Sequence, residues 1–69
     1  MNRREAIDIE NFIMDDLARL SRDLETVNLL IVHFAQRPNV VKRLGAIRRR
    51  LLDIKAEIIA EREIVAQHI

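Results

Sequence analysis

The densest group of side chains that could do chemistry is basic. Its members are Arg37, Lys42, Arg43, Arg48, Arg49 and Arg50, and no acidic residue interrupts them. Guanidinium and ammonium groups at this density can contact phosphate oxygens. On a helix, Arg43 and Arg50 share one face because they are seven residues apart, and Lys42 and Arg49 share a neighbouring face. Lys42, Arg43, Arg48, Arg49 and Arg50 are therefore candidate nucleic-acid contacts.

A simpler interpretation of the same residues is a solvated face balanced by Asp23, Glu25 and Asp53. Charge runs usually lie on the surface. No aromatic side chain stands among the basic residues to stack on bases, and the net charge of the chain is only +1. We favour the solvated face, and nucleic-acid binding is the alternative.

Four acids near the N-terminus, Asp8, Glu10, Asp15 and Asp16, could suggest a metal site or acid–base catalysis. Adjacent aspartates point in different directions on a helix, and the Glu-x-x-His motif of helical di-metal sites is missing from the sequence. A helix dipole and a pairing of Asp15 with Arg19, four residues later, explain the acids better. We expect no metal site.

The remaining reactive groups are scattered. His33 and His68 lie far apart, Ser21 stands alone, and the sequence has no cysteine. Neither a catalytic triad nor a glycine-rich phosphate loop can be assembled from them. We therefore expect no enzyme and no cofactor, and only an active site shared between subunits stays open as an alternative.

The composition indicates which elements must position these residues. The 69 residues are 49% apolar but only 3% aromatic, with one glycine and one proline. This favours helices with an aliphatic core and a single turn. Because Pro38 interrupts the helical pattern, we predict one domain, residues 1–69, with helix 1 at about 3–36, a turn at 37–39 and helix 2 at about 40–67.

Local signals support both predicted helices. Asn2 and Glu5 form a capping-box pattern, and Asn39 is placed to cap helix 2. Helix 1 carries an unbroken heptad seam at Ile13, Leu17, Leu20, Leu24, Val27, Ile31 and Phe34. Helix 2 continues it with Val40, Leu44, Ile47, Leu51, Ile54, Ile58 and Val65, with one gap at Glu61. Apolar residues at this spacing predict two helices folded into an antiparallel hairpin.

The hairpin sets a register and leaves apolar residues unused. Folding back at Pro38 brings residue i near residue 76 minus i, so Arg62 should meet Asp15 or Asp16. Further apolar residues lie beside the seams, and so small a chain cannot easily bury enough surface alone. The predicted dimer or partner interface is Leu29, Leu30, Val32, Phe34, Leu52, Ile59 and Ala66. We expect two hairpins to associate into a four-helix bundle.

This architecture resembles that of the Rop family, which are dimeric RNA-binding regulators of plasmid copy number. It resembles equally the helical-hairpin chaperones of bacterial secretion systems, and neither resemblance rests on a sequence motif. We predict a non-enzymatic homodimer that acts by protein–protein interaction, as an adaptor, regulator or chaperone. The alternative is a Rop-like nucleic-acid-binding regulator that uses the basic patch 37–50. Without cysteines, a signal peptide or a membrane span, we expect a cytoplasmic protein.

Overall fold

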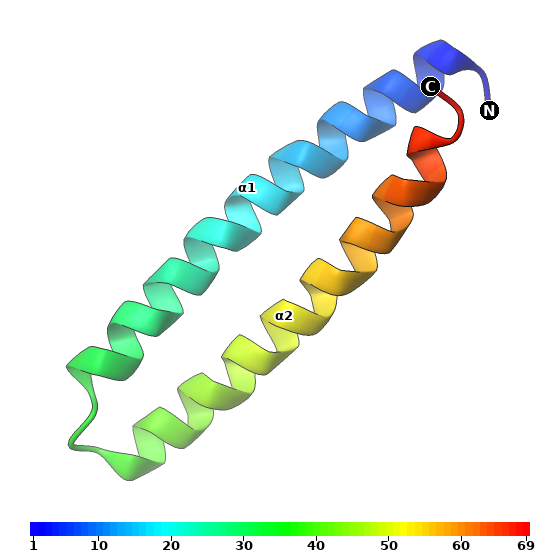
Figure 1. The fold of residues 1–69 in the computed structure, drawn as a ribbon. Coiled ribbons are helices and arrows are strands. Elements are labelled where there is room, and N and C mark those ends of the chain that lie inside the picture. Colours follow the sequence, from blue (N-terminus) through cyan, green and yellow to red (C-terminus); the bar gives the residue numbers. More distant parts are fainter.

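Two long helices and one short turn make up the protein. A computed structural model describes all residues 1–69, with helix α1 at Arg3–His33 and helix α2 at Pro38–Ala66. The helices run antiparallel, so both termini lie at one end and the turn lies at the other (Figure 1). This confirms the prediction of an all-α, two-helix hairpin. The molecule is a rod with extents of 52 × 15 × 10 Å.

The start of α1 follows the predicted capping box. The backbone N–H of Glu5 donates to Asn2 Oδ1 over 2.8 Å, and Asn2 Nδ2 donates to Glu5 Oε1 over 3.0 Å. The side chain of Asn2 thus satisfies one of the N–H groups that the first turn leaves unpaired. The glutamate returns to the amide group of the cap rather than to its backbone.

The turn lies earlier in the chain than predicted. Helix α1 ends at His33 and not near 36, and α2 begins at Pro38 and not at 40. Proline suits the first position of a helix because its missing N–H would have no helical partner there. Arg37 is therefore the cap residue and makes no side-chain cap bond, whereas Asn39 lies inside the helix. The predicted capping role of Asn39 is wrong.

The predicted seam of α1 faces α2 as expected. Ile13, Leu20 and Val27 are buried, and Leu17 and Leu24, between them, are half-buried. Near the open end, Ala6, Ile13 and Val65 form the buried cluster against which Leu17 and Ile58 pack. The core is thus a single aliphatic line that follows the length of the rod.

Helix α2 is rotated about its axis relative to the predicted seam. Leu44, Leu51, Ile58 and Val65 are half-buried or buried, as expected. Ile47 and Ile54, also assigned to the seam, are instead 49% and 36% exposed. The positions next to the buried row on its other side are Arg48, Lys55 and Arg62. Placing Ile47 and Ile54 in the hairpin seam was therefore wrong.

Two polar contacts accompany this rotation. Arg48 Nε donates to Asn28 Oδ1 over 2.9 Å, a pair that matches the predicted register. Arg62 Nε lies 3.8 Å from Glu10 Oε1, rather than near Asp15 or Asp16 as predicted. Both basic groups thus reach polar atoms of α1 from the side of α2 that lies opposite Ile47 and Ile54.

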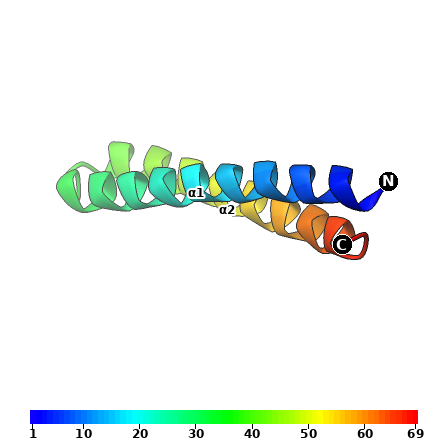
Figure 2. The ribbon, with the colours of Figure 1, turned by 90° about the horizontal axis from the view of Figure 1, so that it is seen from above.

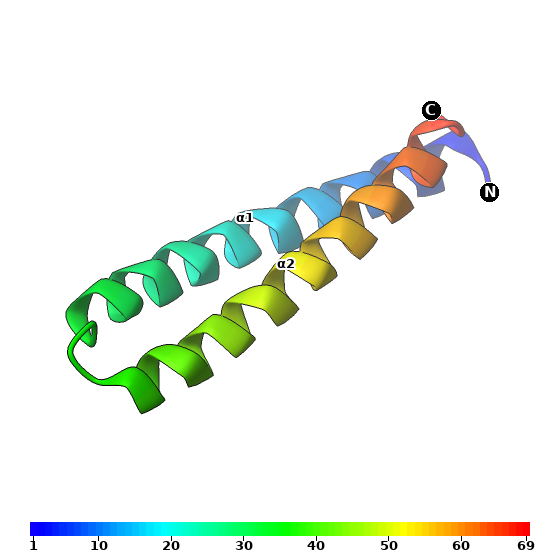
Figure 3. The same cartoon turned by 60° about the horizontal axis from the view of Figure 1, so that its bottom comes forward.

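The two helices remain side by side from the turn to the termini (Figure 3). They are not strictly parallel, because α2 crosses α1 at a shallow angle when the rod is seen from above (Figure 2). Side-chain ridges of one helix pack into grooves of the other at such shallow angles. A hairpin of this shape has two long lateral sides, one on each side of its seam.

Candidate functional site

Exposed apolar side chains are the most unusual feature of the surface. Only five of the 69 residues are buried. The exposed large hydrophobic residues are Met1, Ile7, Ile9, Phe12, Met14, Leu29, Leu30, Val32, Ile47, Leu52, Ile54, Ile59, Ile64 and Ile69. Apolar surface on this scale marks interaction sites, because leaving it in water costs stability and promotes aggregation.

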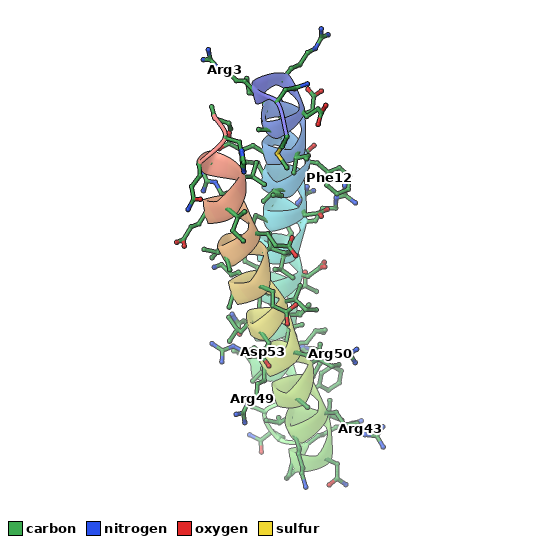
Figure 4. The ribbon with its side chains drawn as sticks, turned by 90° about the vertical axis from the view of Figure 1, so that its right-hand side faces the viewer. Arg3, Phe12, Arg43, Arg49, Arg50 and Asp53 are labelled. Carbon is green, nitrogen blue, oxygen red and sulfur yellow. The ribbon has the colours of Figure 1, made fainter.

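One group of these residues lies on one lateral side of the rod, and we call it the Ile54 face: Ile47 and Ile54 on α2 and, nearer the termini, Ile9 and Phe12 on α1. Ile47 and Ile54 are seven residues apart and share a stripe along α2. Ile9 and Phe12 are three residues apart and are neighbours on α1. Phe12 points to the same side of the rod as Arg43 and Arg50, which neighbour Ile47 and Ile54 (Figure 4).

A second strip lies on the other side of α2, and we call it the Ile59 face, made of Leu52, Ile59 and Ala66. All three residues belong to the predicted interface and are exposed. They follow one another at intervals of seven. Leu52 is one turn from Arg49, which points away from Arg43 and Arg50 (Figure 4). The rod therefore has an apolar strip on each lateral side.

The rest of the predicted interface lies at the turn end. Leu29 and Val32 are strongly exposed and line a surface hollow together with Glu25 and Asn28. Leu30 is exposed on a different part of α1. Phe34 is half-buried, and its ring stands edge-on to His33 with the centroids 4.8 Å apart. The predicted interface thus divides between the turn end and the Ile59 face.

The basic residues do not form one continuous patch. Lys42 and Arg43 line a surface hollow with Asn39 and Ala46. Arg43 and Arg50 point to one side of the rod, as their seven-residue spacing predicts, and Arg49 points to the other (Figure 4).

Arg48 bonds Asn28, so its guanidinium is partly occupied within the hairpin. None of the five candidate phosphate contacts takes part in an ion pair, since the two salt bridges are Arg62–Glu10 and Arg19–Asp16.

The acidic residues near the N-terminus have separate partners. Asp16 lies 3.9 Å from Arg19 on the next turn of α1, whereas the predicted partner of Arg19 was Asp15. Glu10 bonds across to α2. No three His, Asp or Glu side chains come together in a way that could hold a metal ion. Neither helix has the length and apolar composition needed to cross a membrane.

Sequence reasoning missed the Ile54 face as a surface because it assigned Ile47 and Ile54 to the core. The signal that could have found it is the row Arg48, Lys55 and Arg62, also spaced by seven. Arg48 and Arg62 in this row can reach polar partners on α1, because Asn28 and Glu10 lie at corresponding positions along the antiparallel helix.

In comparisons with known proteins, the chain matches no protein-family model, no curated protein and no solved structure. The fold defines the chain as an α-helical hairpin. The resemblances to Rop and to secretion chaperones stay predictions about architecture.

Proposed function

We propose that this chain is a non-enzymatic, homodimeric helical bundle that acts by binding another protein, as an adaptor, regulator or chaperone. The observation that carries the proposal is the exposed apolar surface on both lateral sides of a rod with only five buried residues. Two separate apolar strips provide for two contacts, one with a second copy and one with a partner protein.

The dimensions support an assembly. The accessible surface is 5697 Å², whereas a folded monomer of 8.1 kDa is expected to expose about 4,500 Å². The radius of gyration is 15.8 Å, against about 11 Å for a globular domain of this length. The excess area exceeds the roughly 800 Å² that each partner buries in a standard protein–protein interface.

Sedimentation equilibrium of the full chain tests the dimer. We expect twice the chain mass of 8.1 kDa at micromolar concentration, with the helical signal in circular dichroism lost as dilution separates the copies. A monomer that stays folded, with a sharp melting transition, would overturn the proposal.

A second candidate function is nucleic-acid binding by the basic patch 37–50. It is favoured by the hollow that Lys42 and Arg43 line and by the lack of ion pairs at Arg43, Arg49 and Arg50. Phosphate contacts release counterions, so the affinity should fall steeply as salt rises.

Fluorescence anisotropy with a labelled RNA hairpin and a DNA duplex at low salt tests this candidate. Replacing Arg43, Arg49 and Arg50 with glutamine should abolish binding, while sedimentation checks that the assembly is unchanged. If neither nucleic acid binds the unaltered protein at low salt, nucleic-acid binding is excluded.

A further inference from the structure

Helix α2 carries an apolar heptad seam of two adjoining rows, and helix α1 covers only one of these rows. The row at Leu44, Leu51 and Ile58 is half-buried against α1. The adjoining row at Ile47 and Ile54 is open to solvent, although the two rows together form one continuous apolar seam. Such a seam has the width of a bundle core, of which α1 covers one part.

Helix α1 extends the open seam into a surface that spans both helices. Phe12, which is 64% exposed, points to the same side of the rod as Arg43 and Arg50 (Figure 4). Ile9 neighbours Phe12 on α1, and Ile47 and Ile54 neighbour the two arginines on α2. A surface formed by two antiparallel helices fits another pair of helices of the same length. A second copy of this chain has the required length and presents the same apolar surface.

The charges are distributed unequally along the rod. The half towards the turn, residues 20–54, has seven Lys and Arg side chains and three Asp and Glu side chains. The half towards the termini, residues 1–19 and 55–69, has five Lys and Arg side chains and eight Asp and Glu side chains. Two rods side by side in the same direction would place like charges together, whereas opposite directions place the basic half of each beside the acidic half of the other.

The same pattern recurs beside the Ile54 face itself. On α2, Arg43 and Arg50 precede Ile54 on this side, and Glu57 and Glu61 follow it. None of these four residues has an ion-pair partner within the hairpin. A twofold axis through Ile54 brings Arg50 of one copy near Glu57 of the other, since both lie about one turn from the axis.

We propose that two hairpins pack antiparallel through the Ile54 face, with the two Ile54 side chains meeting at the twofold axis. Arg50 of each copy then lies opposite Glu57 of the other, and Ile47 lies opposite Glu61. This inference rests on the proposed homodimer and specifies its face and direction. The Ile59 face stays open for a different protein.

Single cysteines test the direction, because the natural chain has none. A disulfide needs Cα atoms within about 7 Å, so Ile54→Cys should crosslink with its own copy under mild oxidation. Ile47→Cys alone should not, but a mixture of Ile47→Cys and Glu61→Cys chains should give the mixed dimer. Crosslinking of Ile47→Cys with itself would show parallel packing and would overturn the inference.

The outcomes separate this inference from the proposed function. A dimer in sedimentation that gives no disulfide at residue 54, with the thiols titrated as reactive, would show that another face is used. The homodimer would then stand and the inference would fail. A folded monomer in sedimentation would overturn both.

A charge reversal gives a second test that needs no crosslink. Arg50→Glu places two acidic groups together at two symmetric positions, so the dissociation constant should rise at least about tenfold. The double variant Arg50→Glu/Glu57→Arg should restore the original value. Equal dissociation constants for the single variant and the unaltered chain would contradict the antiparallel pairing.

Discussion

At the scale of single residues, two asparagines show how local chemistry depends on backbone position. Asn2 precedes α1 and accepts the Glu5 N–H with its side chain. Asn39 follows Pro38 and lies within α2, where its side chain has no cap bond. Both occupy sequence contexts that favour a cap, but only Asn2 has the extended backbone that a cap residue needs.

Replacing each of the two asparagines with alanine gives a test and its matched control. Asn2→Ala should lower the free energy of unfolding by about 1 kcal/mol, because the first turn of α1 loses its side-chain acceptor. Asn39→Ala should change it by less than about 0.5 kcal/mol, since no bond is lost. Urea denaturation at one protein concentration measures both. A larger loss for Asn39→Ala would indicate that α2 begins at residue 40.

At the scale of elements, the rotation of α2 decides which apolar residues form the hairpin core. Arg48 and Arg62 reach Asn28 and Glu10 on one side of the buried row, and Ile47 and Ile54 lie exposed on its other side. Exposed ion pairs contribute little to stability. The rotation therefore persists because Leu44, Leu51 and Ile58 contact α1 on their own.

Truncation of one residue on each side of the seam tests the rotation. Leu20 is 7% exposed, so Leu20→Ala should lower the free energy of unfolding of the protein by about 2–5 kcal/mol. Ile47→Ala should cost clearly less, because its side chain is half in solvent in the hairpin and lies opposite Glu61 in the proposed dimer. Thermal and urea unfolding compare the two variants, and equal costs would contradict the rotation.

At the scale of the whole molecule, the rod has more surface than a compact monomer of its mass is expected to expose. Ordering a residue costs roughly 1.5 kcal/mol, and a single aliphatic line between two helices offsets little of this cost. The chain has no cysteine with which a disulfide could stabilise the fold, and no three His, Asp or Glu side chains come together as metal ligands. In the proposed dimer, a second copy supplies the missing burial.

Folding coupled to association makes stability depend on concentration. We expect the melting temperature to rise by a few degrees for each tenfold increase in protein concentration, since a tenfold change corresponds to about 1.4 kcal/mol. Circular dichroism melts over a hundredfold range of concentration measure this. A constant melting temperature would show that the hairpin is stable on its own.

The sequence by itself determined that the chain is helical, where it turns to within a few residues, and which side of α1 is buried. These features depend on local signals: a cap, a proline and an apolar repeat with a fixed period. The same repeat on α2 was ambiguous, because the row at Leu44 and Leu51 is flanked by apolar residues on one side and by Arg48 and Lys55 on the other.

Only the tertiary structure decided which flank of α2 faces α1. Periodicity defines an apolar stripe on each helix but not the angle at which two stripes meet. That angle depends on contacts between residues far apart in sequence, here Arg48 with Asn28 and Arg62 with Glu10. The apolar residues of α2 that looked like one seam were thereby divided between the core and the exposed Ile54 face.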